Sequence, residues 1–362
     1  MVQVIIQPGD GIGALIKAID RARKSIEIMI FRFDEREIEQ ALTRAAERGV
    51  FVHALIAFTN HGGEEHLRKL EQHLLQKGIT VARTADDLVR YHAKYMVIDE
   101  QQLFLLAFNF SHLDIERSRS FGIITSNHEL VNEARKLFEC DVKRLSYKSG
   151  SSQLVVSPVN ARQVLGDFIS GAKRELLIYD PEVSDRALVR LLGERAKAGV
   201  RIAIIGKVTK KATLDWRKLN GMRLHTRVIL RDGLSAFVGS QSLRKLELDS
   251  RREAGVIFRD SKVVGTMRRI FEKDWDVATP VKKTAKLPVK KTAKRVAKVM
   301  TKRLPLAPVV SHVVEVIRQD TNLTLHPKEV EDTVKEAVKD ALKDAVKDAA
   351  KRVVKTVVEQ EL

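Results

Sequence analysis

Two histidines in this chain are each followed, two residues later, by a cation. His92 precedes Lys94 in the segment HAKYMVID, and His225 precedes Arg227 in the segment HTRVILRD. On a β-strand the histidine and the cation of each pair point to the same face, because side chains alternate between faces. An imidazole beside a fixed positive charge suits phosphate chemistry: the imidazole attacks phosphorus or donates a proton, and the cation neutralises the phosphoryl oxygens. Two such pairs can flank one phosphorus atom.

Both histidine segments end in an aspartate and lead into a second apolar stretch with further polar residues. In the first copy Asp99 is followed by Asn109. In the second copy Asp232 is followed by Ser240 and Ser242. We assign these five residues a substrate-binding or supporting role, and we expect the aspartates at strand ends because aspartate favours turns. Either histidine alone would be typical of a hydrogen-bonded strand residue, but the matched context favours one shared site.

The two segments resemble the signature of the phospholipase D superfamily, His-x-Lys-x-x-x-x-Asp followed further on by Gly-Ser-x-Asn. The similarity extends over roughly residues 10–276, and Glu253 stands where the superfamily often has a glutamate that orients a histidine. The resemblance implies cleavage of a phosphodiester through a covalent phosphohistidine, without a metal. It also implies that Lys94 and Arg227 hold the non-bridging oxygens.

Both copies depart from this signature. In the first copy Leu106 and Ala107 replace Gly-Ser, and Ser120 stands in place of the orienting glutamate. In the second copy Arg227 replaces the lysine and Ser242 replaces the asparagine. Arginine binds phosphate through a planar fork rather than as a point charge, so this exchange changes the geometry of the contact. Each copy nevertheless keeps what the other has lost, which predicts a composite site.

The resemblance assigns the attack on phosphorus to His92 and the proton donation to His225. We expect Glu253 to hydrogen-bond to His225, the histidine of its own copy, and His92 to lack a carboxylate partner. The predicted function is a phosphodiesterase that acts on nucleic acid or phospholipid. Two alternatives stay open: a catalytically decayed nucleic-acid-binding protein, and a phospholipase D that works at a membrane surface.

The segments around the two motifs repeat the succession of strand, helix, glycine turn and strand. The strands of the repeated units are expected within residues 22–30, 48–56, 172–179 and 198–205. Near-continuous apolar strands separated by a helix are typical of βαβ units in a buried sheet. We therefore predict an α/β fold, a duplicated phospholipase D-like α/β sandwich whose pseudo-symmetric halves comprise residues 1–149 and 150–279.

Composition limits the cofactors and the cellular setting. Cys140 is the single cysteine among 362 residues, which excludes an intrachain disulfide and a four-cysteine metal site. We expect no metal and no other cofactor. No apolar run approaches the roughly 20 residues needed to cross a bilayer, and the first residues lack the features of a secretory signal. The sequence therefore predicts a cytoplasmic protein, and it does not indicate an oligomeric state.

Two segments of different composition follow the predicted halves. Residues 280–326 form a basic linker arm rich in Pro, Lys and Ala, which we expect to be disordered, and residues 327–362 form a charged amphipathic helix. The formal net charge of +18 and the arm together indicate a polyanionic partner. Nucleic acid is the expected partner, an anionic phospholipid surface is the alternative, and a solvated linker is the plain interpretation. The arm's candidate contacts are Lys282, Lys283, Lys286, Lys290, Lys291, Lys294 and Arg295.

Overall fold

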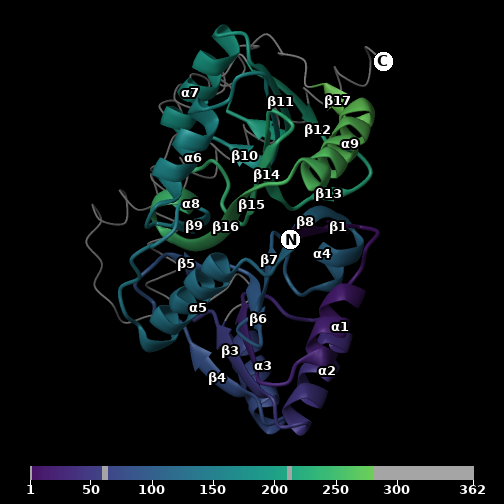
Figure 1. Ribbon diagram of the computed structural model, residues 1–362, viewed down its shortest axis with the longest axis vertical. Helices are drawn as coiled ribbons and strands as arrows, with labels where there is room; N and C mark the ends of the chain where they lie inside the picture. Colours follow the sequence, from purple (N-terminus) through teal and green to yellow (C-terminus); the bar gives the residue numbers. More distant parts are fainter. Residues whose placement is uncertain (1, 59–63, 210–213, 281–362) are drawn as a thin grey trace, which may run out of the picture. The chain divides into compact units, whose positions relative to one another are not determined.

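The computed structural model describes residues 2–58, 64–209 and 214–280 of the chain (Figure 1). These residues belong to one compact unit, Met1–Val281, and the unit Lys282–Leu362 follows it. The predicted terminal helix and the cationic residues of the arm therefore lie outside the described residues.

The described elements fall into two successive series that resemble one another. The first series is β1 (Val2–Gln7), α1 (Gly13–Arg21), β2 (Ser25–Ile30), α2 (Arg36–Glu47), β3 (Phe51–Ile56), α3 (Glu64–Gln76), β4 (Thr80–Arg83), β5 (Arg90–Tyr91), β6 (Tyr95–Ile98), β7 (Gln102–Leu106), α4 (His112–Glu116), β8 (Ser118–Thr125) and α5 (His128–Lys143). The second series is β9 (Leu154–Ser157), α6 (Ala161–Ser170), β10 (Glu175–Val183), α7 (Arg186–Lys197), β11 (Arg201–Val208), β12 (Asp215–Lys218), β13 (Arg223–Leu224), β14 (Arg227–Arg231), β15 (Ser235–Gly239), α8 (Lys245–Asp249), β16 (Arg251–Arg259), α9 (Ser261–Val277) and β17 (Thr279–Pro280).

The two series build two mixed β-sheets with the same strand order. In the first sheet the order is β1-β8-β7-β6-β2-β3-β4, and in the second β9, β16, β15, β14, β10, β11 and β12 follow one another in the same way. In each sheet the strands of the βαβ units are parallel (β2-β3-β4 and β10-β11-β12), while the other pairs in the succession are antiparallel. The predicted α/β fold with two similar halves is thereby confirmed.

Helices cover both sheets, and a shared core joins the halves. On α2 the buried residues Ile38, Ala41, Leu42 and Ala45 recur at helical spacing, so one face of the helix packs against the first sheet. Helices α6 and α7 cover the second sheet in the equivalent way. A third cluster draws on the opposite faces of both sheets and on α5 and α9, which lie beside the boundary between the halves in Figure 1.

Each half lends a two-residue strand to the sheet of the other half. β5, just before His92, pairs in parallel with β16 of the second half. β13, just before His225, pairs in parallel with β8 of the first half. The backbone N–H of His92 continues the first pairing by donating to the carbonyl of Arg252 (2.7 Å), and that of His225 donates to the carbonyl of Arg119 (3.1 Å). Both histidines are thus placed at the boundary between the halves.

Two buried ion pairs connect these same arginines to a helix of the opposite half. Arg119 of β8 bonds to Asp274 of α9 (Nε–Oδ2 2.6 Å), and Arg252 of β16 bonds to Asp141 of α5 (Nε–Oδ1 3.1 Å). All four residues are at most 9 % exposed. Removing one partner of such a pair leaves a buried charge uncompensated, so the pairs fix how the halves meet. The ion pairs thereby also fix the backbone carbonyls of Arg119 and Arg252, which accept the N–H groups of the two histidines.

Candidate active site

The two histidine segments converge on one site at the boundary between the halves. His92 is 7 % exposed and His225 is 8 % exposed, and Lys94 and Arg227 beside them are also buried. Burial lowers the pKa of His92 well below its ordinary value, and the charges of Lys94, Arg227 and His225 lower it further. Lys94 and Arg227 also lower the pKa of His225, so the four residues act on one another as one electrostatic cluster.

His92 is paired with the carboxylate of Glu253, at 2.8 Å between Nδ1 and Oε2. Glu253 is fully buried, and burial raises its pKa. The expectations that Glu253 would hold His225 and that His92 would lack a carboxylate are therefore wrong. The physical reason is the strand exchange: β5 pairs with β16, so His92 lies beside the strand that carries Glu253.

His225 has a carboxylate partner that the sequence analysis missed. Nδ1 of His225 lies 3.0 Å from Oδ2 of Asp114, a residue of the short helix α4. The same Oδ2 accepts bonds from the backbone N–H (2.9 Å) and the side-chain Nδ2 (2.6 Å) of Asn109. Ser120, at the place of the missing glutamate, instead donates its hydroxyl to the carbonyl of His225 (2.8 Å). Each histidine thus contacts a carboxylate of the opposite half. The two carboxylates are not equivalent in the repeat, because Glu253 lies in strand β16 and Asp114 lies in helix α4.

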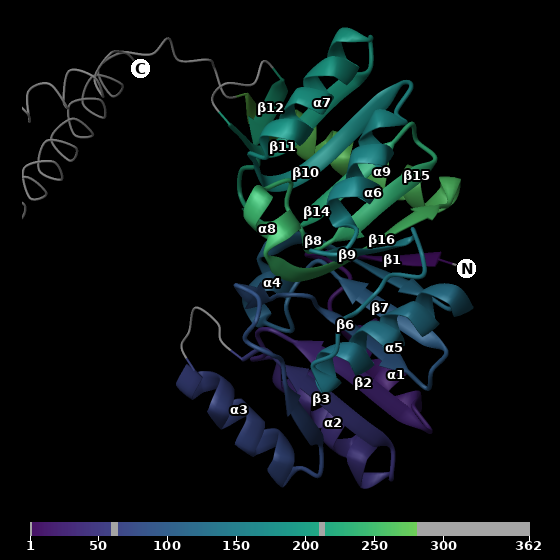
Figure 2. The ribbon, with the colours of Figure 1, turned by 90° about the vertical axis from the view of Figure 1, so that its left-hand side faces the viewer.

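The second half contains the counterpart of Asp114, which is Glu247 of α8. Glu247 accepts a bond from the backbone N–H of Ser242 (2.7 Å), and its Oε2 lies 3.5 Å from Nη2 of Arg227. Arg227 also donates from Nε to the hydroxyl of Ser242 (3.0 Å). Figure 2 shows α8 and α4 at the same edge of the molecule, above and below the boundary. An acid five residues after both Asn109 and Ser242 was the available signal in the sequence.

Lys94 lies against the imidazole of His92. Its Nζ is 2.8 Å from Nε2 and 2.9 Å from Nδ1 of that ring. The Phe31 ring meets His92 edge to face at 4.5 Å between centroids, which fixes the orientation of the imidazole. Burial lowers the pKa of Lys94 to about 7. The ammonium form therefore predominates below about pH 7, and its charge opposes protonation of His92.

The two histidines differ in the charge of their partners. Burial opposes ionisation of Asp114, but the bonds and charges of His225, Asn109 and Arg223 outweigh it and hold the pKa of Asp114 below its ordinary value. Burial lowers the pKa of His225 to about 4, and Asp114 acts in the opposite direction by favouring the imidazolium. His225, beside a firmly ionised carboxylate, is thus better placed to carry a proton than His92, which faces Lys94.

The other predicted residues serve the strands around the site. Asp99 accepts the backbone N–H of Lys24 (2.7 Å), and Asp232 accepts that of Arg174 (2.7 Å), at the ends of β6 and β14 away from the histidines. These aspartates hold the starts of β2 and β10 and do not join the histidine cluster. The buried Ser240 exchanges hydrogen bonds with the backbone of Ala254, next to Glu253.

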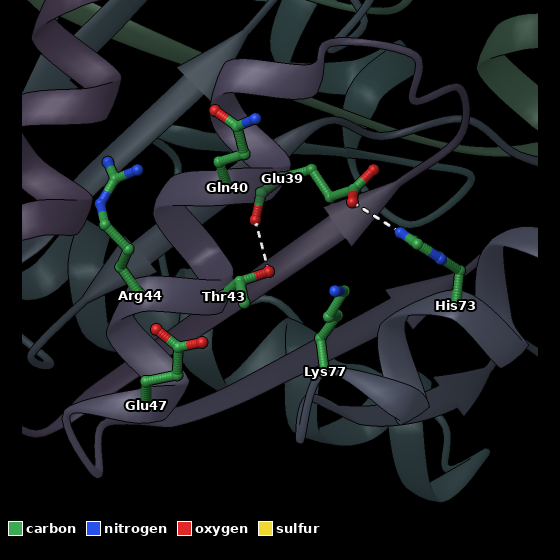
Figure 3. Close-up of a pocket in the computed structure, with 7 residues that line it drawn as sticks. All are labelled: Glu39, Gln40, Thr43, Arg44, Glu47, His73 and Lys77. Carbon is green, nitrogen blue, oxygen red and sulfur yellow. Dashed lines mark hydrogen bonds and ion pairs between the residues drawn. The ribbon is translucent and has the colours of Figure 1, made fainter.

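A separate cavity of about 390 Å³ lies between α2 and α3 (Figure 3). It contains an ion pair between His73 and Glu39, with 2.7 Å between Nε2 and Oε1. Neither His92 nor His225 lines it, so it is distinct from the histidine cluster. The lining residues are Glu39, Gln40, Thr43, Arg44, Glu47, His73 and Lys77.

Residues 2–58, 64–209 and 214–280 contain no group of three or more His, Cys, Asp or Glu arranged to hold a metal ion. Across the same described ranges, no helix combines the length and the apolar character that crossing a membrane requires.

Comparison with known proteins gives the following similarities. The family model described as "Cardiolipin synthase, PLD-like domain" matches residues 15–142 and 165–275. Cardiolipin synthase 1 of Bacillus cereus is 22 % identical over 334 residues, covering 74 % of this chain and 65 % of that protein. Mitochondrial cardiolipin hydrolase of Danio rerio is 27 % identical over 145 residues, covering 39 % and 63 %. The chain thus spans just under two thirds of the length of each of these relatives.

Among solved structures, phosphatidylserine synthase from Haemophilus influenzae Rd KW20 superposes with a TM-score of 0.62 at 13 % identity. The match covers 86 % of this chain and 94 % of that one. At this identity the similarity concerns the fold, and it extends across both halves.

Proposed function

Because the chain belongs to the phospholipase D superfamily, a group of phosphodiesterases and phospholipid-modifying enzymes, we propose that it cleaves phosphodiesters through a phosphohistidine on His92. The observation that carries the proposal is the joining of two histidine–carboxylate pairs and two cations in one buried cluster. His92 pairs with Glu253, and His225 lies beside Asp114. A nucleophile, a proton donor and the means to neutralise a phosphate are then available together.

His92 is the nucleophile. With Glu253 accepting the proton of Nδ1, the lone pair of Nε2 is free to attack phosphorus. The lowered pKa keeps this imidazole neutral at physiological pH. Lys94, 2.8 Å from Nε2, is placed to transfer its contact to a phosphoryl oxygen as the substrate enters.

His225 is the general acid and then the general base. As the bond from Nε2 of His92 to phosphorus forms, the bond to the leaving oxygen breaks and that oxygen takes a proton from His225. In the second step a water molecule attacks phosphorus, His225 accepts the water's proton, and the N–P bond breaks. Because the pKa of free His225 is lowered to about 4, the anionic diester must raise it on binding, in concert with Asp114.

Lys94 and Arg227 hold the non-bridging oxygens. Among the described residues, Nη1 of Arg227 is a buried donor that no acceptor satisfies. A buried guanidinium N–H without a partner is costly, so a phosphoryl oxygen at this place would satisfy it. This geometry supports phosphate binding whether or not bond cleavage follows, and a phosphate-binding protein without activity is therefore the second candidate.

Hydrolysis of bis-p-nitrophenyl phosphate in excess EDTA tests the proposal. We expect turnover to persist, because histidines and cations supply the electrostatic role of a metal. His92→Ala should lower the rate by about 10³-fold or more, whereas the matched control His73→Ala, in the separate cavity, should not change it. Loss of activity on chelation, or equal rates for both variants, would exclude this mechanism.

A further inference from the structure

Arg227 is held along one edge of its planar guanidinium group. Nε donates to the hydroxyl of Ser242 (3.0 Å), and Nη2 lies 3.5 Å from Oε2 of Glu247. Nε and Nη2 lie on the same edge of the group, so fixing both nitrogens also fixes Nη1. Arg227 is 8 % exposed, and among the described residues no acceptor meets its Nη1. Ser242 and Glu247 thus leave one defined end of the guanidinium for an anion.

The carboxylate of Glu247 is itself held at both oxygens. Oε2 accepts the backbone N–H of Ser242 (2.7 Å), while Oε1 lies 3.5 Å from Nη1 of Arg244 and 3.3 Å from Nη1 of Arg251. Glu247 is 2 % exposed. A buried carboxylate with donors at both oxygens cannot rotate freely, so it gives the edge of Arg227 that it contacts a fixed orientation.

The first half uses its equivalent residues differently. Asp114, the counterpart of Glu247, accepts the backbone N–H of Asn109 (2.9 Å), as Glu247 accepts that of Ser242. Asn109 then adds a bond from its own Nδ2 to Asp114 (2.6 Å). In the second half the shorter Ser242 has no such amide, and the long side chain of Arg227 reaches the carboxylate instead. The arginine and the serine therefore belong together, because an asparagine at position 242 would compete with Arg227 for Glu247.

We propose that Ser242 and Glu247 are positioning residues, which direct Nη1 of Arg227 at one non-bridging oxygen of the phosphate. The inference rests on the proposed function, in which Lys94 and Arg227 hold the two non-bridging oxygens. In this role Ser242 and Glu247 act through the guanidinium and not on the phosphate itself. A fixed planar donor selects its acceptor by direction, whereas the ammonium of Lys94 is a point charge, so the two oxygens are bound unequally.

Chiral phosphorothioates test this role. In the two enantiomers of methyl p-nitrophenyl phosphorothioate, sulfur replaces one or the other non-bridging oxygen, and sulfur is the weaker acceptor. The probe is neither a nucleotide nor a lipid, so the test does not depend on the natural substrate. In the wild type we expect kcat/KM of the enantiomers to differ by about tenfold or more, because each enantiomer presents sulfur to a different cation. Arg227→Gln should shift this ratio in one direction and Lys94→Gln in the other.

The positioning residues should change the same ratio. Glu247→Gln and Ser242→Ala should each shift it severalfold in the direction of Arg227→Gln. Adding Glu247→Gln to Arg227→Gln should cause no further shift, because the guanidinium that Glu247 positions is then absent. The control is Glu194→Gln, the same exchange at a side chain that is 55 % exposed on α7, and it should leave the ratio unchanged.

The ratio is insensitive to the amount of folded enzyme, because a loss of folded enzyme lowers both rates equally. A wild-type ratio near one would overturn the proposal. So would a ratio that Glu247→Gln or Ser242→Ala leaves unchanged, or a further shift when Glu247→Gln is added to Arg227→Gln.

Exchanging the pair tests whether the arginine and the serine belong together. Arg227→Lys and Ser242→Asn should each lower kcat/KM by about tenfold or more. In the double variant the new asparagine can donate to Glu247 as Asn109 donates to Asp114, and the lysine does not compete for that edge. We therefore expect the double variant to retain more activity than the product of the two single losses gives. Losses that simply multiply would refute the pairing.

A binding measurement separates the failure of this role from the failure of catalysis. Phosphorus NMR titration with each enantiomer gives its dissociation constant without turnover. If neither enantiomer is cleaved but their affinities differ, and Glu247→Gln and Arg227→Gln shift that difference alike, the positioning role stands and the proposed catalysis fails. If neither is cleaved and the affinities are equal or do not respond to Glu247→Gln, the positioning role is refuted as well.

Discussion

Replacing Glu253 with glutamine tests the hydrogen bond by which the second half holds His92 of the first half. Oε2 of this buried carboxylate lies 2.8 Å from Nδ1 of His92 and fixes the proton there, so that Nε2 is free to attack. Glutamine has nearly the same size, but its NH₂ group can donate to Nδ1. The proton of His92 then favours Nε2, and the imidazole cannot act as a nucleophile.

The size of the effect follows from what the carboxylate does. Loss of a hydrogen bond to a charged group costs about 1.5–3 kcal/mol, or roughly a 10- to 10²-fold loss of rate. A wrong tautomer adds to this, and carboxylate-to-amide changes beside a catalytic histidine reach about 10⁴-fold. We therefore expect Glu253→Gln to lower kcat/KM by about 10²- to 10⁴-fold.

The dependence on the leaving group shows which histidine Glu253 serves. Kinetics would be measured on bis-p-nitrophenyl phosphate, whose leaving group needs no proton, and on a thymidine dinucleotide, whose leaving group does. If Glu253 holds the nucleophile His92, both substrates lose rate to a similar extent. Asp114→Asn, beside His225, should instead impair the dinucleotide far more, because loss of general acid catalysis costs about 10²- to 10⁴-fold. A Glu253→Gln enzyme that keeps its rate on the activated diester would refute the assignment.

Three further predictions concern charge, backbone and the arm. Since Lys94 loses its proton above about pH 7, kcat/KM should fall as the pH rises through that value, and Lys94→Arg should move this fall to higher pH in a pH–rate profile. Gly206→Ala should lower the free energy of unfolding by about 4 kcal/mol or more, because a Cβ there would lie 1.8 Å from the carbonyl oxygen of Asp180 at a φ of +148°. Chemical denaturation would check this against Gly166→Ala in α6, where nothing lies within 4 Å and a gain of about 0.5–1 kcal/mol is expected. In a plot of the logarithm of the oligonucleotide binding constant against the logarithm of the salt concentration, neutralising eight phosphates gives a slope of about −7. Deleting residues 282–304 should make this slope shallower. An unchanged slope would place binding on the folded halves.

Local patterns were sufficient to predict the frame of the fold. The buried strands β2 and β3, and their counterparts β10 and β11, coincide with apolar stretches that bracket an amphipathic helix. Asp99 and Asp232 directly follow β6 and β14, in keeping with the preference of aspartate for turns. Such features depend on residues close in the chain or on simple periodicity, so one sequence reveals them.

The partners of the histidines could not be predicted in this way. Glu253 reaches His92 because β5 pairs with a strand of the other half, and a two-residue strand has no periodic signal. Asp114 lies in a five-residue helix that local propensity alone does not indicate. The buried pair of Arg252 with Asp141 joins positions 111 residues apart, and only the assembled halves bring them together.

The site of covalent phosphorylation tests the central claim most directly. In His225→Ala the second step lacks its base, so bis-p-nitrophenyl phosphate should release one p-nitrophenolate and leave an acid-labile p-nitrophenyl phosphoryl group on the enzyme. Rapid quenching and peptide mapping by mass spectrometry should locate that group on His92, and His92→Ala should carry none. An adduct on His225 of the wild type would reverse the two roles. Absence of any adduct, with turnover unchanged in both variants, would contradict a catalytic role for the two histidines.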